Sequence, residues 1–262
     1  MKNLLVLSLM VVIGFSQNLV IQGSTTVLPI TQAAAESYME INKDADITVR
    51  GGGSGTGIAA LIDGATNIAI SSRPMKTKEI KQAREKGVNP VETVIALDGI
   101  AVIVHKDNQV NEISIADLKK IYTGKMTNWK DLGGKGNIVA ISRDVASGTY
   151  EVFNEKVLSG AKLTEGALML ASNLEIVRAV EQTPNAIGYV GIGYISDKVK
   201  VLKVNGITPS EESVKNGIYP LARSLYMYTN GAPKGLAKSF IDFILSTEGQ
   251  KIVSDNGFVP VK

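Results

Sequence analysis

The chain has 262 residues, of which 44% are hydrophobic and 20% are charged, so it can bury a core and is neither disordered nor collagen-like. The 28 basic and 25 acidic residues give a formal net charge of +3, which makes nucleic acid a poor candidate partner. The absence of cysteine and the single histidine exclude disulfides, thiolate chemistry and multi-histidine metal sites. We expect no cofactor and no bound metal.

Residues 1–16 have the pattern of a secretory signal peptide. Lys2 provides a positive start, residues 4–13 are almost entirely apolar, and the small residues Gly14 and Ser16 precede the expected cleavage point. About ten apolar residues rise only ~15 Å as a helix, which is too short to cross a bilayer. Since the chain also has no cysteine for lipid attachment, we expect a soluble, exported, periplasmic protein. A buried N-terminal strand or helix is the alternative for this segment.

Strand-like and helix-like runs alternate along the rest of the chain. In chain order we expect a strand at 19–23, a helix at 30–41, a strand at 47–50, a short helix from Ile58, a strand at 68–71, a helix at 77–86, a strand at 100–105, a helix from Ser114, a strand at 138–142, helices at 149–158 and 173–183, strands at 187–190, 199–204 and 225–229, and a helix through 236–244. The alternation predicts an α/β protein with largely parallel sheets.

Three turns rich in glycine, serine and threonine each follow a predicted strand and precede a predicted helix. They are Gly-Ser-Thr-Thr at 23–26, Gly-Gly-Gly-Ser-Gly-Thr-Gly at 51–57 and Ser-Gly-Thr at 147–149. The free N–H groups and positive dipole of a helix N-terminus favour an anion, and glycine lets the backbone approach it closely. Because open α/β sheets bind ligands at the carboxyl ends of their strands, the three turns together predict an anion site. Each turn alone is also explained by helix capping and turn chemistry.

Arg143, shortly before the third turn, is the expected charge partner of the anion. Its guanidinium can hold two oxygens of a tetrahedral oxyanion at once. The alternative for Arg143 is a surface salt bridge to Asp144 or Glu151, and Asp144 could also orient the guanidinium. Arg73 is a second possible partner, with a solvated arginine as its alternative.

These segments resemble the periplasmic phosphate-binding proteins of high-affinity ABC importers, and the similarity covers essentially the whole mature chain. Each segment is weakly specific, but the set in this order is strongly specific. The segments are GSTTVLP at 23–29, GGGSGTGI at 51–58, IYTGKMTNWKDLGG at 121–134, SRDVASGT at 142–149, AIGYVGIGY at 186–194, PLARSLYMYT at 220–229 and FIDFILSTEGQKIV at 240–253.

The resemblance implies a set of ligand contacts, transferred position by position. These contacts are Ser24, Thr25, Thr26, Ser54, Arg143, Ser147, Gly148 and Thr149. Ser72 occupies the place where some family members have an aspartate that accepts the proton of the bound phosphate. A serine hydroxyl accepts a hydrogen bond but does not repel an unprotonated dianion, so the exclusion of sulfate and the protonation state of the ligand stay open.

The resemblance also implies the fold of type II binding proteins: two α/β lobes, each a mostly parallel sheet flanked by helices, joined by two hinge strands. The expected lobes are residues 17–98 plus 224–262 for lobe one and 99–223 for lobe two, with crossings at 97–104 and 219–227. The first two turns then belong to lobe one, and the third turn with Arg143 belongs to lobe two. A ligand that touches both lobes binds the closed form better and so drives closure.

The expected function is that of a non-enzymatic receptor that binds inorganic phosphate between its lobes and delivers it to the membrane permease of a phosphate ABC importer. One alternative keeps the receptor but changes the ligand to sulfate or another tetrahedral oxyanion. The other is a secreted phosphatase, which needs an activated nucleophile or metal ligands that the sequence does not show convincingly. A monomer is the default expectation for such a receptor, and a signalling role stays open.

Overall fold

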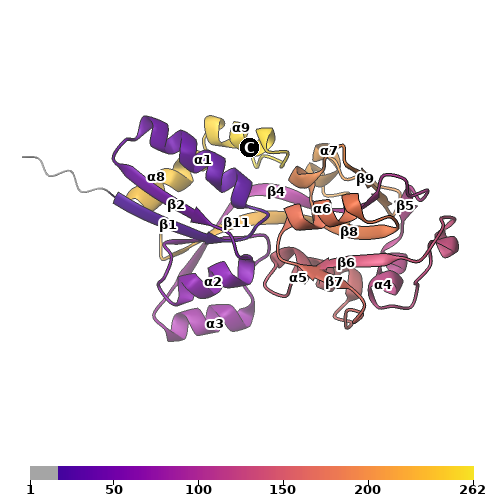
Figure 1. Cartoon of the computed structure of the whole chain (residues 1–262). Helices are drawn as coiled ribbons and strands as arrows, with labels where there is room; N and C mark the ends of the chain where they lie inside the picture. Colours follow the sequence, from indigo (N-terminus) through magenta and orange to yellow (C-terminus); the bar gives the residue numbers. More distant parts are fainter. Residues whose placement is uncertain (1–16) are drawn as a thin grey trace, which may run out of the picture.

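The computed structural model describes residues 17–262, so the predicted signal peptide at 1–16 lies outside the described residues. Two lobes lie side by side in Figure 1. Two extended strands, β4 (Pro90–His105) and β11 (Ala222–Asn230), lie at the junction between them. No helix within 17–262 has the length and apolar character needed to span a membrane.

The first lobe contains the start and the end of the described chain. Its other elements are β1 (Gln17–Gly23), α1 (Leu28–Ile41), β2 (Ala45–Arg50), α2 (Ser54–Ile62), β3 (Ile68–Ser71), α3 (Thr77–Glu85), α8 (Gly235–Ile244) and α9 (Thr247–Asp255). The strand order is β2-β1-β3-β11-β4, with β1 parallel to β2 and β3, and with β11 antiparallel to β3 and β4. Helices α1, α8 and α9 cover one face of this sheet, and α2 and α3 cover the other (Figure 1).

The second lobe continues the same sheet. Its elements are β5 (Glu112–Ile113), α4 (Ile115–Tyr122), a 3-10 turn η1 (Trp129–Leu132), β6 (Val139–Arg143), α5 (Gly148–Phe153), a π-helical turn η2 (Asn154–Leu158), β7 (Leu168–Leu170), α6 (Asn173–Gln182), β8 (Ala186–Gly191), a 3-10 turn η3 (Ile192–Tyr194), β9 (Val199–Val201), β10 (Lys203–Val204) and α7 (Glu211–Lys215). The strand order runs on as β4-β8-β6-β7, with β6 parallel to β7 and β8, while β9 pairs with β4 and β10 pairs with β5.

Strand β4 is shared by the two lobes. Its residues 90–99 pair with β11, and its residues 100–104 pair with β8. The side chains from Ile100 to Val104 are completely buried, because this part of the strand is covered on both faces. The predicted α/β, two-lobed fold class is therefore confirmed, with antiparallel pairs confined to the shared strands and their neighbours.

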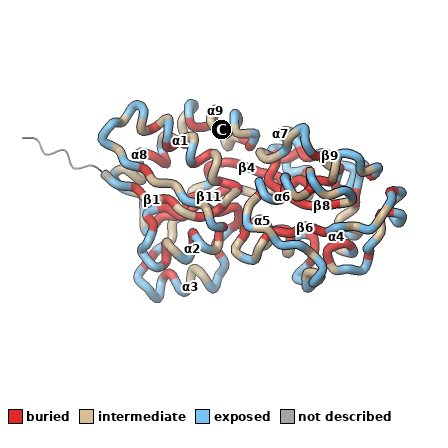
Figure 2. Tube along the Cα trace, viewed as in Figure 1, coloured by how far each residue is buried: buried red, intermediate tan, exposed pale blue. Residues whose placement is uncertain are grey.

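Buried residues follow the sheet through both lobes and line the inner faces of the helices (Figure 2). In the first lobe, Phe240 of α8 packs with Ile21 of β1 on one face, and Ile58 of α2 packs with Ala69 of β3 on the other. In the second lobe, Ile176 of α6 packs against strand residues such as Ile141 in a cluster of its own. Trp129 belongs to the main cluster, on the other face of the sheet. Each sheet segment is thus held rigid between two helical layers, which fixes the loops at the ends of its strands.

Several element boundaries differ from those predicted. Helix α2 begins at Ser54 rather than near Ile58, the predicted helix 149–158 divides into α5 and η2, and the predicted strand 199–204 divides into β9 and β10. The short elements β5, β7 and α7 and the last helix α9 were not predicted. β5, β7 and α7 have two to five residues, too few to show a clear hydrophobic period, whereas α9 has nine residues, as many as the predicted α3, and was missed.

Candidate functional site

The three predicted turns lie at strand ends and lead into helices, as expected. The first connects β1 to α1, the second connects β2 to α2, and the third connects β6 to α5. In the first turn, the Ser24 hydroxyl accepts the backbone N–H of Thr26 at 3.1 Å. In the third turn, the Ser147 hydroxyl caps α5 by accepting the N–H of Thr149 at 3.2 Å. In both serines the hydroxyl oxygen therefore accepts a hydrogen bond from the backbone of its own turn and stabilises that turn.

The hydroxyl groups of the first and third turns meet between the lobes. The Oγ1 atoms of Thr26 and Thr149 lie 3.1 Å apart, although the residues are 123 positions apart in the chain. Both side chains are buried, with 1% of each residue exposed. Asn173, the first residue of α6, donates from Nδ2 to the Thr26 oxygen at 3.1 Å. The structure therefore brings these two predicted residues into direct contact across the cleft.

The second turn joins the same region through Ser54. Its Oγ lies 3.3 Å from the Oγ of Ser72, which follows β3, and accepts the Ser72 backbone N–H at 3.0 Å. Gly148 of the third turn lies directly against this pair, since a Cβ on Gly148 would come 2.3 Å from the Ser54 oxygen and 2.7 Å from the Ser72 oxygen. The backbone N–H of Gly55 also donates across the cleft to the carbonyl of Ala146 at 3.0 Å. The two lobes are thus closed on each other at these turns.

Arg143, the last residue of β6, supplies the positive charge of the cluster. The residue is 1% exposed. Its Nη2 donates to Thr25 Oγ1 at 2.9 Å and to the carbonyl of Ala171 at 2.7 Å, and its Nε donates to the carbonyl of Leu170 at 3.3 Å. Its Nη1 is buried and has no hydrogen-bond partner within residues 17–262.

No acidic side chain in the described range forms an ion pair with Arg143. The alternative of a surface salt bridge is therefore wrong, because Asp144 instead accepts the N–H of Ala146 and Glu151 pairs elsewhere. Burial, which Tyr189 and Asp144 offset only in part, lowers the pKa of Arg143 to about 10. The guanidinium is thus a buried cation with a free Nη1 group, and its other donors bond only to neutral oxygens, those of Thr25, Leu170 and Ala171.

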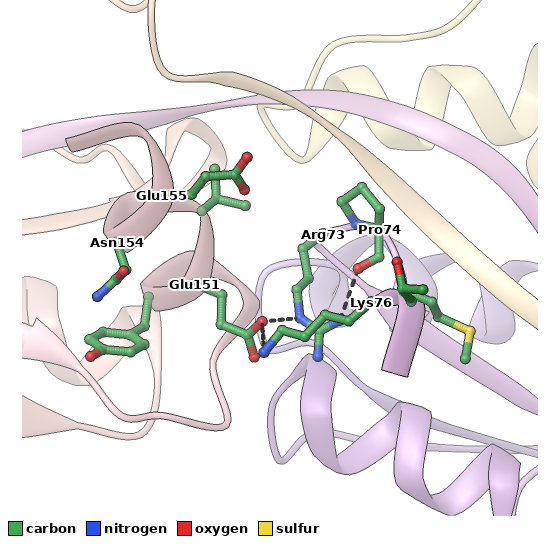
Figure 3. Close-up of a pocket in the computed structure, with 10 residues that line it drawn as sticks. Arg73, Pro74, Lys76, Glu151, Asn154 and Glu155 are labelled. Atoms are coloured by element: carbon green, nitrogen blue, oxygen red, sulfur yellow. Dashed lines mark hydrogen bonds and ion pairs between the residues drawn. The ribbon is translucent and has the colours of Figure 1, made fainter. Parts of the chain in front are cut away.

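Arg73 follows Ser72 in the chain, but its guanidinium is engaged in a different group of charges. It forms two hydrogen bonds with the Glu79 carboxylate, at 2.6 and 2.7 Å, and its Nε lies 2.7 Å from the Glu151 carboxylate of α5. Lys76 reaches the same Glu151 oxygen at 2.7 Å. Figure 3 shows Arg73, Lys76 and Glu151 of this group beside a cavity of about 550 Å³ formed by residues 73–77 and by α5 and η2.

The ion pairs of Arg73 with Glu79 and Glu151 link the two lobes. Burial disfavours the charged form of Arg73, but the hydrogen bonds and charges of Glu79 and Glu151 outweigh it and raise the pKa of Arg73. Glu79 belongs to α3 of the first lobe, whereas Glu151 belongs to α5 of the second. Arg73 therefore acts between two carboxylates at the cleft rather than presenting a free edge to an anion.

Three polar residues at the cluster, Asp98, Asn173 and Arg223, were not predicted from the sequence as site residues. Arg223 of β11 forms a buried ion pair with Asp98 of β4 at 2.7 Å and donates to Thr149 Oγ1 at 3.0 Å. Asn173 was predicted only as the start of a helix. A signal for the pair was present, because Asp98 and Arg223 are single charges within the apolar strands predicted as the two crossings, and isolated buried charges need partners.

Two aromatic rings hold the arginine strand in place. The hydroxyl groups of Tyr189 of β8 and Ser142 form a hydrogen bond of 2.8 Å, in which either group can be the donor. The Tyr189 oxygen also accepts the backbone N–H of Arg143 at 3.2 Å. Its ring stacks on Phe153 of α5, with centroids 3.9 Å apart. Burial raises the pKa of Tyr189 to about 12, so the phenol stays neutral. The strand carrying Arg143 and the helix after the third turn are thereby fixed to one another.

Comparisons with known proteins identify the family to which the chain belongs. A family model described as a PBP superfamily domain matches residues 15–248. The chain is 41% identical over 249 residues to the phosphate-binding protein PstS of Bacillus subtilis, covering 94% of this chain and 81% of that protein. It is 33% identical to the PstS protein of Borreliella burgdorferi, covering 92% of this chain and 89% of that one.

Solved structures show the same similarity in three dimensions. A substrate-binding protein from Clostridium perfringens, crystallised with bound phosphate, superposes with a TM-score of 0.87 at 39% identity, covering 94% of this chain and all of that one. An ABC-type phosphate transport receptor from Vibrio cholerae gives a TM-score of 0.77 at 27% identity, covering 92% and 99%. The chain belongs to the PBP superfamily and, within it, to the PstS family.

Proposed function

We propose that this chain is an extracytoplasmic receptor that binds inorganic phosphate between its lobes and delivers it to the membrane permease of an ABC importer. The observation that carries the proposal is the buried Arg143 guanidinium, whose Nη1 has no hydrogen-bond partner in the described chain. A buried cation without a counter-ion is costly, and a bound anion removes that cost. The names of the PstS relatives and the bound phosphate of the Clostridium perfringens protein support the same ligand.

The proposed contacts are neutral donors around one cation. They are Ser24, Thr25, Thr26, Ser54, Ser72, Arg143, Ser147, Gly148 and Thr149, through hydroxyl groups, backbone N–H groups and the guanidinium. Hydroxyl and amide donors hold a small anion through many short hydrogen bonds, which are stronger in a buried cleft than in water. Arg73 is a candidate for closing the lobes rather than for contacting the anion, since its guanidinium is already paired with two carboxylates.

We place lobe one at residues 17–98 plus 224–262 and lobe two at 99–223. The support is that β4 exchanges β11 for β8 as its partner between Gly99 and Ile100. The contacts proposed for phosphate then come from both lobes, so that the anion binds the closed form more tightly than the open one. That difference in affinity is what favours closure.

The location and assembly of the protein follow from the same proposal. The charged and apolar pattern of residues 1–16 supports export by a signal peptide, and delivery to an importer requires a protein outside the cytoplasmic membrane. We place the receptor in the periplasm as a monomer that presents its closed form to the permease. Sedimentation of the purified protein with and without phosphate tests the monomer.

Calorimetry on ligand-stripped protein tests the proposed function. Phosphate is expected to bind with one site per chain, and a protein that is silent to phosphate but gives heat with sulfate would end the phosphate assignment. A phosphatase assay with a chromogenic ester separates the receptor from an enzyme. Steady phosphate release that is lost in Arg143→Ala and absent from a mock preparation would overturn the receptor in favour of a phosphatase.

Sulfate is expected to bind measurably to the wild-type protein, because the Ser72 hydroxyl does not repel an unprotonated dianion. Ser72→Asp is expected to weaken sulfate binding at least about 10-fold more than phosphate binding, since a carboxylate repels sulfate but accepts a proton from phosphate. Competition calorimetry with the two anions measures the ratio. An equal loss for both anions would show that a carboxylate at residue 72 does not accept a proton from the bound phosphate.

Glu151→Gln is expected to weaken phosphate binding by about 3- to 10-fold, because it removes the ion pair between Arg73 and α5 while leaving Arg73 paired with Glu79. The loss should change little at high salt, because this ion pair is largely buried and salt screens buried charges weakly. Glu155→Gln is the matched control, since Glu155 lines the same cavity and is exposed (Figure 3). Equal effects of the two substitutions would show that Glu151 contributes nothing to closure.

A further inference from the structure

A second buried guanidinium lies beside the hydroxyl cluster. The side chain of Arg223 is 4% exposed and that of its partner Asp98 is fully buried. The second carboxylate oxygen of Asp98 accepts the backbone N–H of Ile192 at 2.9 Å. The pair therefore fastens β4, β11 and η3, which directly follows β8, to one another at the junction of the lobes.

The two Nη groups of Arg223 face three of the loops that line the cleft. Its Nη2 donates to Thr149 Oγ1 at 3.0 Å and to Thr26 Oγ1 at 3.4 Å, and its Nη1 donates to the Ser72 carbonyl at 3.3 Å. Thr149 lies on the second lobe, whereas Thr26 and Ser72 lie on the first. Because Asp98 offsets its charge, Arg223 acts here mainly through the direction of its N–H groups.

The direction of these hydrogen bonds decides where the threonine protons can go. Guanidinium and amide N–H groups only donate, so each threonine oxygen that meets them must accept. Thr149 accepts from Arg223, Thr26 accepts from Asn173, and Thr25 accepts from Arg143 and Asn173. Each hydroxyl proton is then left to point at another acceptor. Thr26 and Thr149 can share one proton between them, and the other remains for an anion oxygen.

We propose that Arg223, anchored by Asp98, is a positioning residue of the anion site: because it donates to the oxygens of Thr149 and Thr26, the hydroxyl proton that these two threonines do not share points toward the bound anion. This inference rests on the proposed function, because it needs an anion between the lobes. Strands β4 and β11, which carry Asp98 and Arg223, then contribute to recognition of the anion and also connect the two lobes. The threonine pair then presents a proton donor to the anion.

A double-mutant cycle tests the role of Arg223, with phosphate affinity measured by calorimetry on ligand-stripped protein. Arg223→Lys keeps a charge for Asp98, but a single ammonium group cannot pair with Asp98 and also span Thr149 and Thr26. We expect Arg223→Lys and Thr149→Val each to weaken phosphate binding about 10- to 100-fold. In the Thr149→Val background, Arg223→Lys should cost no more than about 3-fold further.

The cycle distinguishes positioning from a structural role. If the two losses simply multiply, or if Arg223→Lys leaves the affinity unchanged, the proposal is overturned, since a structural effect would not depend on the Thr149 hydroxyl. If Arg223→Lys does not fold, the neutral pair Asp98→Asn with Arg223→Gln takes its place in the same cycle with the same expected coupling. Arg50→Lys, at an exposed position, is the control. A wild-type protein that does not bind phosphate would overturn the proposed function itself.

Discussion

Arg143→Ala is expected to weaken phosphate binding by at least about 100-fold, whereas Arg73→Ala is expected to cost less than about 10-fold. Charge-assisted hydrogen bonds contribute about 1.5–3 kcal/mol each, and Arg143 has a free Nη1 edge that can supply two of them. Arg73 has no free Nη group, because both of its Nη groups are hydrogen-bonded to Glu79 and its Nε lies 2.7 Å from the Glu151 carboxylate. Calorimetry on the stripped proteins measures both losses.

The folding of each variant must be checked, since both side chains are almost fully buried. Arg73→Ala leaves Glu79 and Glu151 without their main partner and is expected to lower the thermal midpoint of the ligand-free protein. Arg143→Ala removes a buried cation that has no counter-ion, so it should change that midpoint less. Equal losses of phosphate affinity from the two variants would mean that the charge partner of the anion is wrongly assigned.

The sequence predicted the turns and the arginine of this site because their signals are local. A strand, a run of small residues and a helix follow one another within about ten positions, and each run is read without knowing the fold. That Thr26 and Thr149 touch could not be read locally, because they are separated by 123 positions. Only the resemblance to a two-lobed family indicated that the turns face one another.

The start of α2 shows how local propensity misleads. Glycine disfavours a helix, so the run at 51–57 was expected to be a loop throughout. The helix nevertheless begins at Ser54, and a Cβ on Gly57 would lie 2.4 Å from the carbonyl oxygen of Gln22. Gly57 is therefore a packing residue that lets α2 approach β1, and tertiary contact outweighs its propensity.

The charged residues that the sequence did not assign to the site are those whose partners are remote. Arg223 lies 125 positions from Asp98, and each charge alone in an apolar strand only indicates that some partner exists. Arg73 illustrates the reverse case. Its position next to Ser72 suggested an anion contact, yet the sequence did not show that a carboxylate from the other lobe would occupy it.

Gly148→Ala is expected to weaken phosphate binding by at least about 100-fold without destabilising the ligand-free protein. An added Cβ would lie 2.3 Å from the Ser54 oxygen and 2.7 Å from the Ser72 oxygen. Ser54 cannot simply rotate away, because its oxygen accepts the Ser72 backbone N–H at 3.0 Å. The lobes must therefore stay further apart, which separates Thr26 from Thr149 and withdraws donors from the anion.

Gly148→Ala is expected to raise the stability of the ligand-free protein slightly, although it weakens phosphate binding. Gly148 is the first residue of α5, and its φ is not positive, so alanine is compatible with its backbone and improves helix propensity by up to about 1 kcal/mol. Gly55→Ala is the matched control, because its Cβ would meet only backbone atoms of Ala146, the nearest of them the carbonyl oxygen at 3.4 Å. We expect Gly55→Ala to change phosphate affinity less than about 3-fold.

Small-angle scattering then separates a blocked closure from a damaged fold. The radius of gyration of the wild type should fall when phosphate is added, and that of Gly148→Ala should not. A Gly148→Ala protein that closes and binds phosphate like the wild type would show that the anion is not held where α5 meets Ser54 and Ser72. Closure and affinity must fail together, because in this arrangement the same contact between lobes that excludes a methyl group also brings the threonine donors to the anion.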